Sequence, residues 1–326
     1  MHQATIYVVI VNWNGKKQLQ KCLTSFFAKD PGSFCEVVVV DNASADGSVE
    51  LVQKEFPQVR LIENVNNEGF SKANNQGIRY ALLNNADYVL LLNNDIEIAE
   101  PKWLETMVRV FAANSRIGIV GCKLLFFGGK IQHAGGIIKL RGAYHRGEGE
   151  TDRGQFDRVE YVDYVTGAAL LIKKDVIQKI GFLDEGYSPL YFEDTDWCVR
   201  AFLYGFKIAY TPHPALIHHC GVSASKLGPS KKNFYYHRSF VRFVLLNFQL
   251  KDILKRFLRY ESLTALACLF VRTRGGKVPI ILRNDASTRL SLFIEAWMPS
   301  VLDLKKITIL RRQRFIFGRK INLQKS

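Results

Sequence analysis

The chain has 326 residues, 48% of them hydrophobic and only 9 of them proline, which excludes an intrinsically disordered protein and suits one large domain with an appendage. Its net charge of +15 is unevenly placed: residues 1–222 carry 23 Lys and Arg against 25 Asp and Glu, whereas residues 223–326 carry 22 against 5. A near-neutral body with a strongly basic tail predicts an anionic partner surface, either a membrane or a nucleic acid.

Cysteine usage and hydropathy bear on the compartment. The 6 cysteines form no Cys-x-x-Cys pair and no metal-ligand spacing, and the first residues lead into a predicted strand without a signal-peptide pattern. No uncharged apolar segment approaches the roughly 20 residues of a membrane-spanning helix. We therefore expect a protein of the reducing cytoplasm.

The first 84 residues alternate between predicted strands and helices. β-Branched and apolar runs predict strands over residues 6–11, 36–40 and 59–62. Apolar residues at helical spacing predict helices over residues 16–27, 49–56 and 71–84, with Ser48 as the cap of the second. This alternation is typical of an α/β layer architecture with a parallel sheet and right-handed crossovers.

Residues 88–97, YVLLLNNDIE, predict a further strand that is buried on both faces and ends in Asn93, Asn94 and Asp95. In open α/β sheets, ligands bind at the carboxyl ends of the strands. A hard cation that also contacts diphosphate oxygens takes one or two carboxylates in such a place. The alternative is that Asn-Asn-Asp only turns the chain, since these residues favour turns.

Three of the predicted strands end in polar side chains, which would lie side by side at one edge of the sheet. These are Asn12 and Asn14 after the first strand, Asp41, Asn42 and Ser44 after the second, and Asn93, Asn94 and Asp95 after the strand over residues 88–92. Together they predict a nucleotide pocket. The pocket has no Gly-x-Gly-x-x-Gly or Gly-Lys-Ser/Thr loop, which argues against a dinucleotide dehydrogenase or a P-loop enzyme, so a diphosphate there would need a metal.

The second half of the body is less regular. We expect a helix over residues 101–113, a strand over 117–127, a hairpin or mobile loop over 128–154 and a strand over 162–173. The last of these contains Thr166-Gly167-Ala168-Ala169, small residues that either let a substrate approach the backbone or allow tight strand packing. Short strands follow over residues 208–211 and 215–219, and the second ends in His218 and His219, which are either structural or metal ligands.

Glu193, Asp194 and Asp196 crowd together before a predicted short helix over residues 198–204. Acids at a helix start are stabilised by capping and by the helix dipole, which is a purely structural explanation. Capping, however, needs one acid rather than three. Like charges this close raise the pKa of one of them, which suits a general base.

As a set, these motifs resemble the family 2 inverting glycosyltransferases with the GT-A fold, and within them the rhamnosyltransferase-like members. The matching segments are residues 8–15 (VVIVNWNG), 37–48 (VVVVDNASADGS), 67–77 (NEGFSKANNQG), 91–97 (LLNNDIE), 165–172 (VTGAALLI), 181–197 and 215–223. The resemblance implies a GT-A fold, with a Rossmann-like nucleotide-binding half and a mixed, mostly parallel sheet with helices on both faces.

The resemblance also implies a role for each matching residue. Asp41, with the backbone near Asn12 and Asn14, would hold the base and ribose, and Asn67, Gly69 and Asn74 would line the diphosphate side. Asp95 would bind Mg²⁺ or Mn²⁺; the family's Asp-x-Asp motif begins here with Asn93, which leaves Asp95 the stronger ligand. Asp194 would be the catalytic base, and His218 would reach the metal or diphosphate. If the motif aligns one residue later, His219 would take this role instead. Further substrate contacts are expected from Asn42, Ser44, Asn93, Asn94, Gly167 and Glu193.

The reaction implied is metal-dependent, inverting sugar transfer from a nucleoside diphosphate, with rhamnose from dTDP-rhamnose as the expected donor and a lipid-linked or growing cell-surface glycan as the acceptor. The alternatives are a UDP- or GDP-hexose donor, or a nucleotidyltransferase of similar fold. A nucleotidyltransferase should carry a glycine-rich, basic loop after the first strand, and residues 12–15 lack one. A nucleic-acid-binding protein that uses the tail is a third alternative; the acids of the body favour the enzyme, and we expect no nucleic acid partner.

The basic tail divides from the body at residue 233. We expect a catalytic domain over residues 1–232, with a nucleotide-sugar half over 1–97 and an acceptor half over 98–232, and a basic amphipathic helical region over 233–326. Within residues 233–259, Lys251, Lys255 and Arg259 recur every four residues beside an apolar side, and residues 290–317 repeat the pattern. Such helices bind anionic membrane surfaces, which would place the protein peripherally on the inner face of the cell membrane. Alternatively, their apolar sides pack on the catalytic domain.

Overall fold

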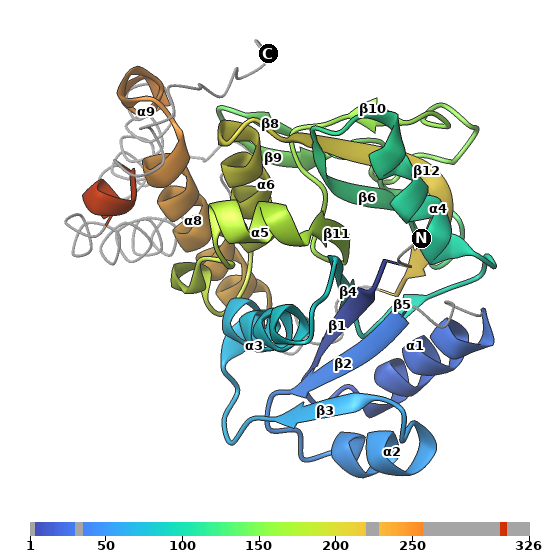
Figure 1. Cartoon of the computed structure of the whole chain (residues 1–326). Coiled ribbons are helices and arrows are strands. Elements are labelled where there is room, and N and C mark those ends of the chain that lie inside the picture. The colour runs from blue at the N-terminus through green and yellow to red at the C-terminus, as the bar shows by residue number, and fades with distance from the viewer. Residues whose placement is uncertain (1–3, 30–34, 220–227, 257–306, 312–326) are drawn as a thin grey trace, which may run out of the picture.

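The computed structural model describes residues 4–29, 35–219, 228–256 and 307–311, and they form a central sheet with helices on both faces (Figure 1). The strands are β1 Ile6–Asn12, β2 Cys35–Asp41, β3 Arg60–Glu63, β4 Tyr88–Asn93, β5 Ile96–Glu97, β6 Ile117–Phe126, β7 Ile131–His133, β8 Gly136–Lys139, β9 Gly142–His145, β10 Glu160–Tyr161, β11 Ala169–Lys173 and β12 Lys207–His218. The helices are α1 Lys16–Ala28, α2 Ser48–Glu55, α3 Gly69–Leu83, α4 Trp103–Arg109, α5 Lys174–Ile180, α6 Glu193–Leu203, α8 Gly228–Asn247 and α9 Leu250–Arg256, with 3₁₀ turns η1 Val110–Ala113 and η2 Glu185–Tyr187.

Strand β1 lies between β4 and β2 in the sheet order β10-β12-β6-β11-β4-β1-β2-β3. The pairs β4–β1, β1–β2 and β2–β3 are parallel, and β11 is antiparallel to both β4 and β6. The register aligns Asn12 with Asp41, and Val11 with Asn93. The predicted meeting of the polar strand ends at one edge of the sheet is therefore confirmed.

Alternate residues of β1 enter two separate cores. Ile6, Val8 and Ile10 pack with helices α1, α2 and α4, whereas Val9 packs with α3, α5, α6 and α8. The approach of α3 is close, because a Cβ atom on Gly77 would lie 2.3 Å from Cγ1 of Val9. A strand buried on both faces reads as a continuous apolar run, and this is what residues 6–11 show. The predicted α/β fold is confirmed, and with it the helices on both faces.

Several predicted element boundaries are wrong. Helix α6 begins at Glu193 and not at residue 198, so the crowded acids form its first turn. Ser48 opens α2 without capping it, since Gly47 occupies the cap position in a left-handed conformation. The two short strands over residues 208–219 are one strand, β12, with an irregularity between Thr211 and Ala215. Residues 128–154 are not one hairpin: β7 joins the main sheet and β8 pairs with β9.

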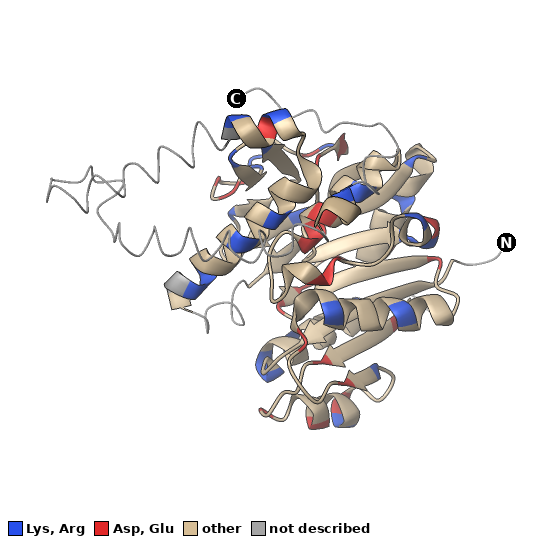
Figure 2. Cartoon of the chain, turned by 90° about the vertical axis from the view of Figure 1, so that its left-hand side faces the viewer, with Lys and Arg blue, Asp and Glu red and all other residues tan. Residues whose placement is uncertain are grey.

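Helix α8 packs on the body through α6, and its basic side chains recur along its length (Figure 2). Phe240, Phe243 and Leu246 are buried, and Arg242 forms an ion pair with Asp184 at 2.9 Å. The packing alternative thus holds for α8, while in α9 Leu250 and Leu254 are 66% and 53% exposed. Of residues 290–317, all but 307–311 lie outside the described residues. Within the described ranges, no helix has the length and apolarity needed to cross a bilayer.

Candidate active site

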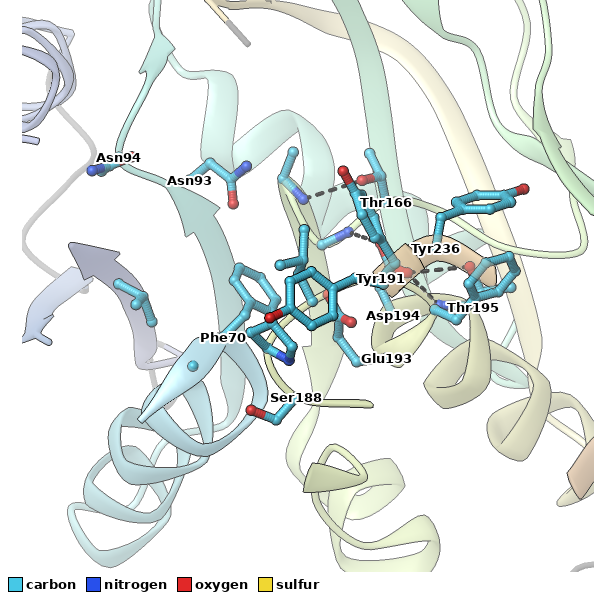
Figure 3. A pocket seen from close by; sticks show the side chains of 18 of the residues that line it. Phe70, Asn93, Asn94, Thr166, Ser188, Tyr191, Glu193, Asp194, Thr195 and Tyr236 are labelled. Carbon is cyan, nitrogen blue, oxygen red and sulfur yellow. Dashed lines mark hydrogen bonds between the residues drawn. The ribbon is translucent and has the colours of Figure 1, made fainter. Parts of the chain in front are cut away.

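A cavity of about 570 Å³ opens where the carboxyl ends of β1 and β4 face the start of α6. Figure 3 shows Asn93 and Asn94 at the end of β4 on one side, and Glu193 and Asp194 at the start of α6 on the other. Ten residues predicted for the site line this cavity: Asn42, Asn67, Gly69, Asn93, Asn94, Asp95, Gly167, Glu193, Asp194 and His218. Segments more than a hundred residues apart in the chain thus share one cavity.

Asp95 faces His218 across the end of β4. Oδ1 of Asp95 lies 3.0 Å from Nε2 of His218, yet it is buried and accepts no hydrogen bond from the described residues. Asp95 belongs to the turn between β4 and β5, and the pairing of β5 with the end of β12 brings His218 opposite it. A buried carboxylate oxygen against an imidazole nitrogen needs a positive charge near it, from a proton or a metal ion.

The Asp95–His218 pair fits a divalent cation. The imidazole nitrogen and the carboxylate oxygen are 3.0 Å apart, close enough that both would hold the same cation. Carboxylate suits Mg²⁺ and Mn²⁺, and imidazole suits transition metals. Three or more His, Cys, Asp or Glu side chains do not converge on a metal position anywhere in the described parts of the chain, so further ligands would come from substrate and water.

His219 points away from Asp95. Its Nε2 lies 2.7 Å from Oε2 of Glu97, its ring packs beside Phe127, and its backbone N–H donates to the carbonyl oxygen of Asp95. Of the two histidines, His218 therefore faces the acid at the end of β4.

The polar strand ends on the nucleotide side form one hydrogen-bond network. Nδ2 of Asn94 donates to Oδ1 of Asn12 at 2.7 Å, and Nδ2 of Asn12 donates to Oδ2 of Asp41 at 2.9 Å. Oγ of Ser44 accepts from the backbone N–H of Asn14 at 2.8 Å, and the backbone N–H of Ser44 donates to Oδ1 of Asp41 at 2.7 Å. Both carboxylate oxygens of the buried Asp41 thus bind protein groups, and the predicted contact of Asp41 with a nucleotide stays a prediction.

The turn into α3 supplies the adjoining wall. Oδ1 of Asn67 accepts the backbone N–H of Gly69 at 2.9 Å, and Gly69 takes φ +78°, a conformation that glycine adopts without strain. Nδ2 of Asn42 donates to the carbonyl of Gly69 at 3.3 Å. Asn74 lies one turn further along α3, is buried, and donates to the carbonyl of Phe70. Asn67 and Gly69 therefore line the cavity, whereas Asn74 holds the helix behind them.

Asp194 is held by donors on two sides (Figure 3). Its Oδ2 accepts the backbone N–H of Gly167 at 2.7 Å, and its Oδ1 accepts the N–H of Thr195 at 2.6 Å and the Thr195 hydroxyl at 3.1 Å. A Cβ on Gly167 would lie 3.4 Å from Cβ of Asp194, which is ordinary van der Waals contact, so the loop before β11 and α6 pack directly against each other here. Each carboxylate oxygen has two lone pairs, so Asp194 can still accept a proton from a substrate.

The other two acids of this turn have different environments. Burial, followed by the nearby charge of Asp194, raises the pKa of Glu193 well above its ordinary value, and Oε2 of Glu193 has no hydrogen-bond partner among the described residues. Asp196 is fully buried, where it accepts from Tyr187, Asn247 and Arg200 at 2.9 Å each. Asp196 therefore ties α6 to its neighbours, and Glu193 is a part of the cavity wall whose burial disfavours the charged carboxylate.

The backbone before α6 is strained. Tyr191 and Phe192 take φ +79° and +71°, left-handed values that side-chain-bearing residues rarely adopt and that cluster at functional sites. The ring of Phe192 packs against Tyr236, Phe240 and Phe243 of α8, which holds this conformation in place. Packing from α8 thus fixes the direction from which Asp194 enters the cavity.

Sequence reasoning missed several residues of the site. Tyr164, His145, Tyr235 and Tyr236 all line the cavity, and Gln132 contacts His218 from behind. The last two tyrosines belong to α8, within the predicted basic tail. His133 and His145, the last residues of β7 and β9, were the available signal for the acceptor half. The division at residue 232 stays a prediction, and it falls within α8.

The mixed sheet with helices on both faces and the cavity at its edge define a GT-A glycosyltransferase fold. Residues 7–181 match the family described as Glycosyl transferase family 2, and the chain belongs to this family.

Three similar proteins illustrate the relationship. An uncharacterized protein, y4gI, of Sinorhizobium fredii is 30% identical over 218 residues, which are 64% of this chain and 23% of y4gI, so the chain spans less than a quarter of that relative. The dTDP-rhamnosyl transferase RfbF of Shigella flexneri is 27% identical over 69% of this chain and 72% of its own length. A structure of GalNAc-T7 with UDP, GalNAc and Mn²⁺ superposes with a TM-score of 0.61 at 14% identity, covering 93% of this chain and 57% of GalNAc-T7, which shows the fold.

Proposed function

We propose that this chain is an inverting glycosyltransferase that uses Mg²⁺ or Mn²⁺ and moves a sugar from a nucleoside diphosphate to a hydroxyl group of a glycan. The observation that carries the proposal is the pairing of two acids in one cavity. Asp95 has an oxygen that accepts no hydrogen bond among the described residues and lies beside an imidazole, and Asp194 lies on the opposite wall with a hydrogen-bonded carboxylate.

On the donor side, Asp95 and His218 would hold the cation, and a bound cation would neutralise the charge that develops on the leaving diphosphate. Asn67 and the backbone of Gly69 lie where the diphosphate would pass, at the start of α3. The N-terminus of this 15-residue helix adds a favourable field for the anion. Asn42 and Asn94 line the adjoining surface toward the base and ribose.

On the acceptor side, Asp194 takes the proton from the acceptor hydroxyl. The hydroxyl oxygen then attacks the anomeric carbon from the face opposite the diphosphate, so the configuration inverts. Gly167 and Thr195 orient the carboxylate by their N–H groups. Tyr164, Tyr191 and Tyr236 surround this part of the cavity, and such aromatic faces suit the apolar faces of sugar rings.

For the donor, we favour dTDP-rhamnose, because RfbF is a dTDP-rhamnosyl transferase that aligns over most of its length. UDP- and GDP-hexoses are the second candidates. A nucleotidyltransferase is disfavoured by the family match and by residues 12–15, which form no glycine-rich basic loop.

A panel of nucleotide sugars tests this function. Each is added to the protein with and without Mn²⁺, and thermal unfolding is followed, because a ligand that binds only the folded state raises the melting temperature. We expect dTDP-rhamnose to stabilise the protein in the presence of Mn²⁺. Stabilisation by a different nucleotide sugar would reassign the donor, and the same stabilisation without metal would contradict the metal dependence.

We further propose that the acceptor is lipid-linked and that α9 rests on an anionic membrane surface, which would place the protein on the inner face of the cell membrane. Leu250 and Leu254 are exposed on α9 beside Lys251 and Lys255, a combination that suits the interface of an anionic bilayer. Helix α8 connects this surface to the cavity, since Tyr235 and Tyr236 line it.

Vesicle binding tests the membrane proposal. Changing Lys251 and Lys255 to Gln should weaken binding to phosphatidylserine vesicles about 30-fold, because each basic residue near such a surface contributes about 1 kcal/mol. The matched control changes the exposed Lys17 and Lys54, on α1 and α2, to Gln and should bind as the unmodified protein does. No binding of the unmodified protein at low salt would contradict the proposal.

A further inference from the structure

Strand β7 contacts two imidazoles of the cavity from behind. Oε1 of Gln132 lies 2.8 Å from Nδ1 of His218, and Nδ1 of His133 lies 2.5 Å from Nδ1 of His145. His145 and His218 line the cavity, whereas Gln132 and His133 do not. Two neighbouring residues of one short strand thus each support a histidine that a substrate or cation can reach.

The contacts of His218 agree on one tautomer. A glutamine carbonyl oxygen only accepts hydrogen bonds, so Nδ1 of His218 carries the proton that Gln132 receives. On the other side of the ring, Nδ2 of Asn93 donates to Nε2 at 3.2 Å, which requires a lone pair on Nε2. Oδ1 of Asp95 lies 3.0 Å from the same nitrogen and accepts no hydrogen bond from the described residues.

The contacts of His133 and His145 indicate the opposite tautomer for His145. Burial lowers the pKa of both side chains, so the pair is neutral and one proton lies between the two Nδ1 atoms. His133 is fully buried, and its Nε2 has no partner in the described part of the chain. A buried N–H without an acceptor is rarer than an acceptor without a donor, so the shared proton belongs to Nδ1 of His133. His145 then carries its own proton on Nε2.

We infer that Gln132 and His133 are positioning residues, which hold His218 with a lone pair on Nε2, the nitrogen beside Asp95, and His145 with its Nε2–H available to an oxygen atom of a sugar or phosphate in the cavity. This inference rests on the proposed function, because the cation and the sugar substrate are what the two nitrogens would meet. Metal-binding histidines commonly donate their second N–H to a carbonyl or carboxylate, as His218 does to Gln132.

Histidine tautomers give a direct test that needs neither metal nor substrate. The protein is labelled with ¹⁵N in its 7 histidines, and two-bond ¹H–¹⁵N correlations report which ring nitrogen carries the proton. His218→Ala and His145→Ala identify the two signals. We expect the proton on Nδ1 of His218 and on Nε2 of His145; a proton on Nε2 of His218, or on Nδ1 of His145, would overturn the inference.

Two variants separate the two contacts, and each serves as the control for the other. Gln132→Met removes the acceptor at similar size and should move the proton of His218 toward Nε2 while His145 is unchanged. His133→Phe should change the tautomer of His145 and leave that of His218 unchanged. His133→Asn, whose amide can donate from nearly the same position, should restore the original tautomer of His145. If His133→Phe does not fold, His133→Asn and His133→Ala provide the comparison. Tautomers that stay as in the unmodified protein in every variant would overturn the inference.

Mn²⁺ binding, followed by electron paramagnetic resonance, separates this inference from the proposed function. Gln132→Met should weaken Mn²⁺ binding about 10–100-fold, Gln132→Glu should retain it, and the exposed control Gln155→Met should leave it unchanged. If Asp95→Ala and His218→Ala abolish Mn²⁺ binding but Gln132→Met does not weaken it, the positioning role fails and the metal site stands. If Asp95→Ala and His218→Ala leave Mn²⁺ binding unchanged, the metal site fails and this inference fails with it.

Discussion

The two walls of the cavity each hold an aspartate carboxylate, but in opposite hydrogen-bonding environments. At the end of β4, Asp95 is buried with an oxygen that accepts no hydrogen bond from the described residues and faces an imidazole nitrogen. At the start of α6, Asp194 receives two backbone N–H groups and a hydroxyl. The first environment needs a nearby positive charge, from a proton or a metal ion, and the second stabilises the carboxylate by hydrogen bonds within the protein. The difference supports our proposal that Asp95 binds the cation and that Asp194 takes the proton.

The largest effect is expected from Asp194→Asn. An amide cannot take the proton of the acceptor hydroxyl, so kcat should fall by roughly 10²–10⁴, the usual contribution of a general base. Donor binding, followed by thermal stabilisation with Mn²⁺ and the nucleotide sugar, should stay near that of the unmodified protein. Lost donor binding with unchanged turnover at saturation would place Asp194 on the donor side and contradict the different roles proposed for Asp194 and Asp95.

Asp95→Ala should act on binding rather than on proton transfer. Removing a direct metal ligand should weaken metal-dependent donor binding by more than about 100-fold, because removing a supporting residue alone costs about 10–100-fold. The measurement is a Mn²⁺ titration at a fixed concentration of nucleotide sugar. Glu50→Ala, which removes an exposed acid in the first turn of α2, is the control; an equal loss in both variants would contradict the proposal.

The third acid of the α6 turn should affect stability alone. Asp196→Ala removes the carboxylate that forms an ion pair with the buried Arg200. The uncompensated charge should lower the free energy of unfolding by about 3–5 kcal/mol. Urea unfolding measures the change, and Asp175→Ala, an exposed acid in the first turn of α5, is the control expected to change it little. A stable Asp196→Ala variant with greatly reduced turnover would instead give Asp196 a catalytic role.

The smallest effect concerns Glu193 and depends on pH. Between the ordinary pKa of 4.5 and its raised pKa, the folded protein holds a proton that the unfolded chain has lost, so the stability contribution of Glu193 falls as pH rises. Glu193→Gln removes this loss, and its melting temperature should exceed that of the unmodified protein more at pH 8 than at pH 4. An equal difference at both pH values would show that Glu193 is ionised in the folded state.

The wall on the proposed donor side, formed at the carboxyl ends of β1, β2 and β4, could be predicted from sequence because each strand and the polar residues that end it are neighbours in the chain. An apolar run followed by polar residues is visible within ten positions, and the parallel order of β4, β1 and β2 brings three such endings together. The opposite wall of the cavity, at the start of α6, could be predicted only in part. The crowded acids at residues 193–196 marked it, but their different roles depend on Gly167, Asn247 and Tyr187, which come from other elements.

The sequence by itself therefore determined the α/β layers, the edge at which the site lies, and the candidate acids and histidines, because periodicity and strand-end chemistry depend on neighbouring residues. The tertiary structure alone decided that His218 rather than His219 faces Asp95, that Asp196 is buried while Asp194 reaches the cavity, and that α8 contributes two tyrosines to it. It also placed Gln132 and His133 behind the two cavity histidines. The physical reason is that hydrogen-bond partners and burial depend on contacts between segments far apart in the chain, and the spacing of residues along the sequence does not encode these contacts.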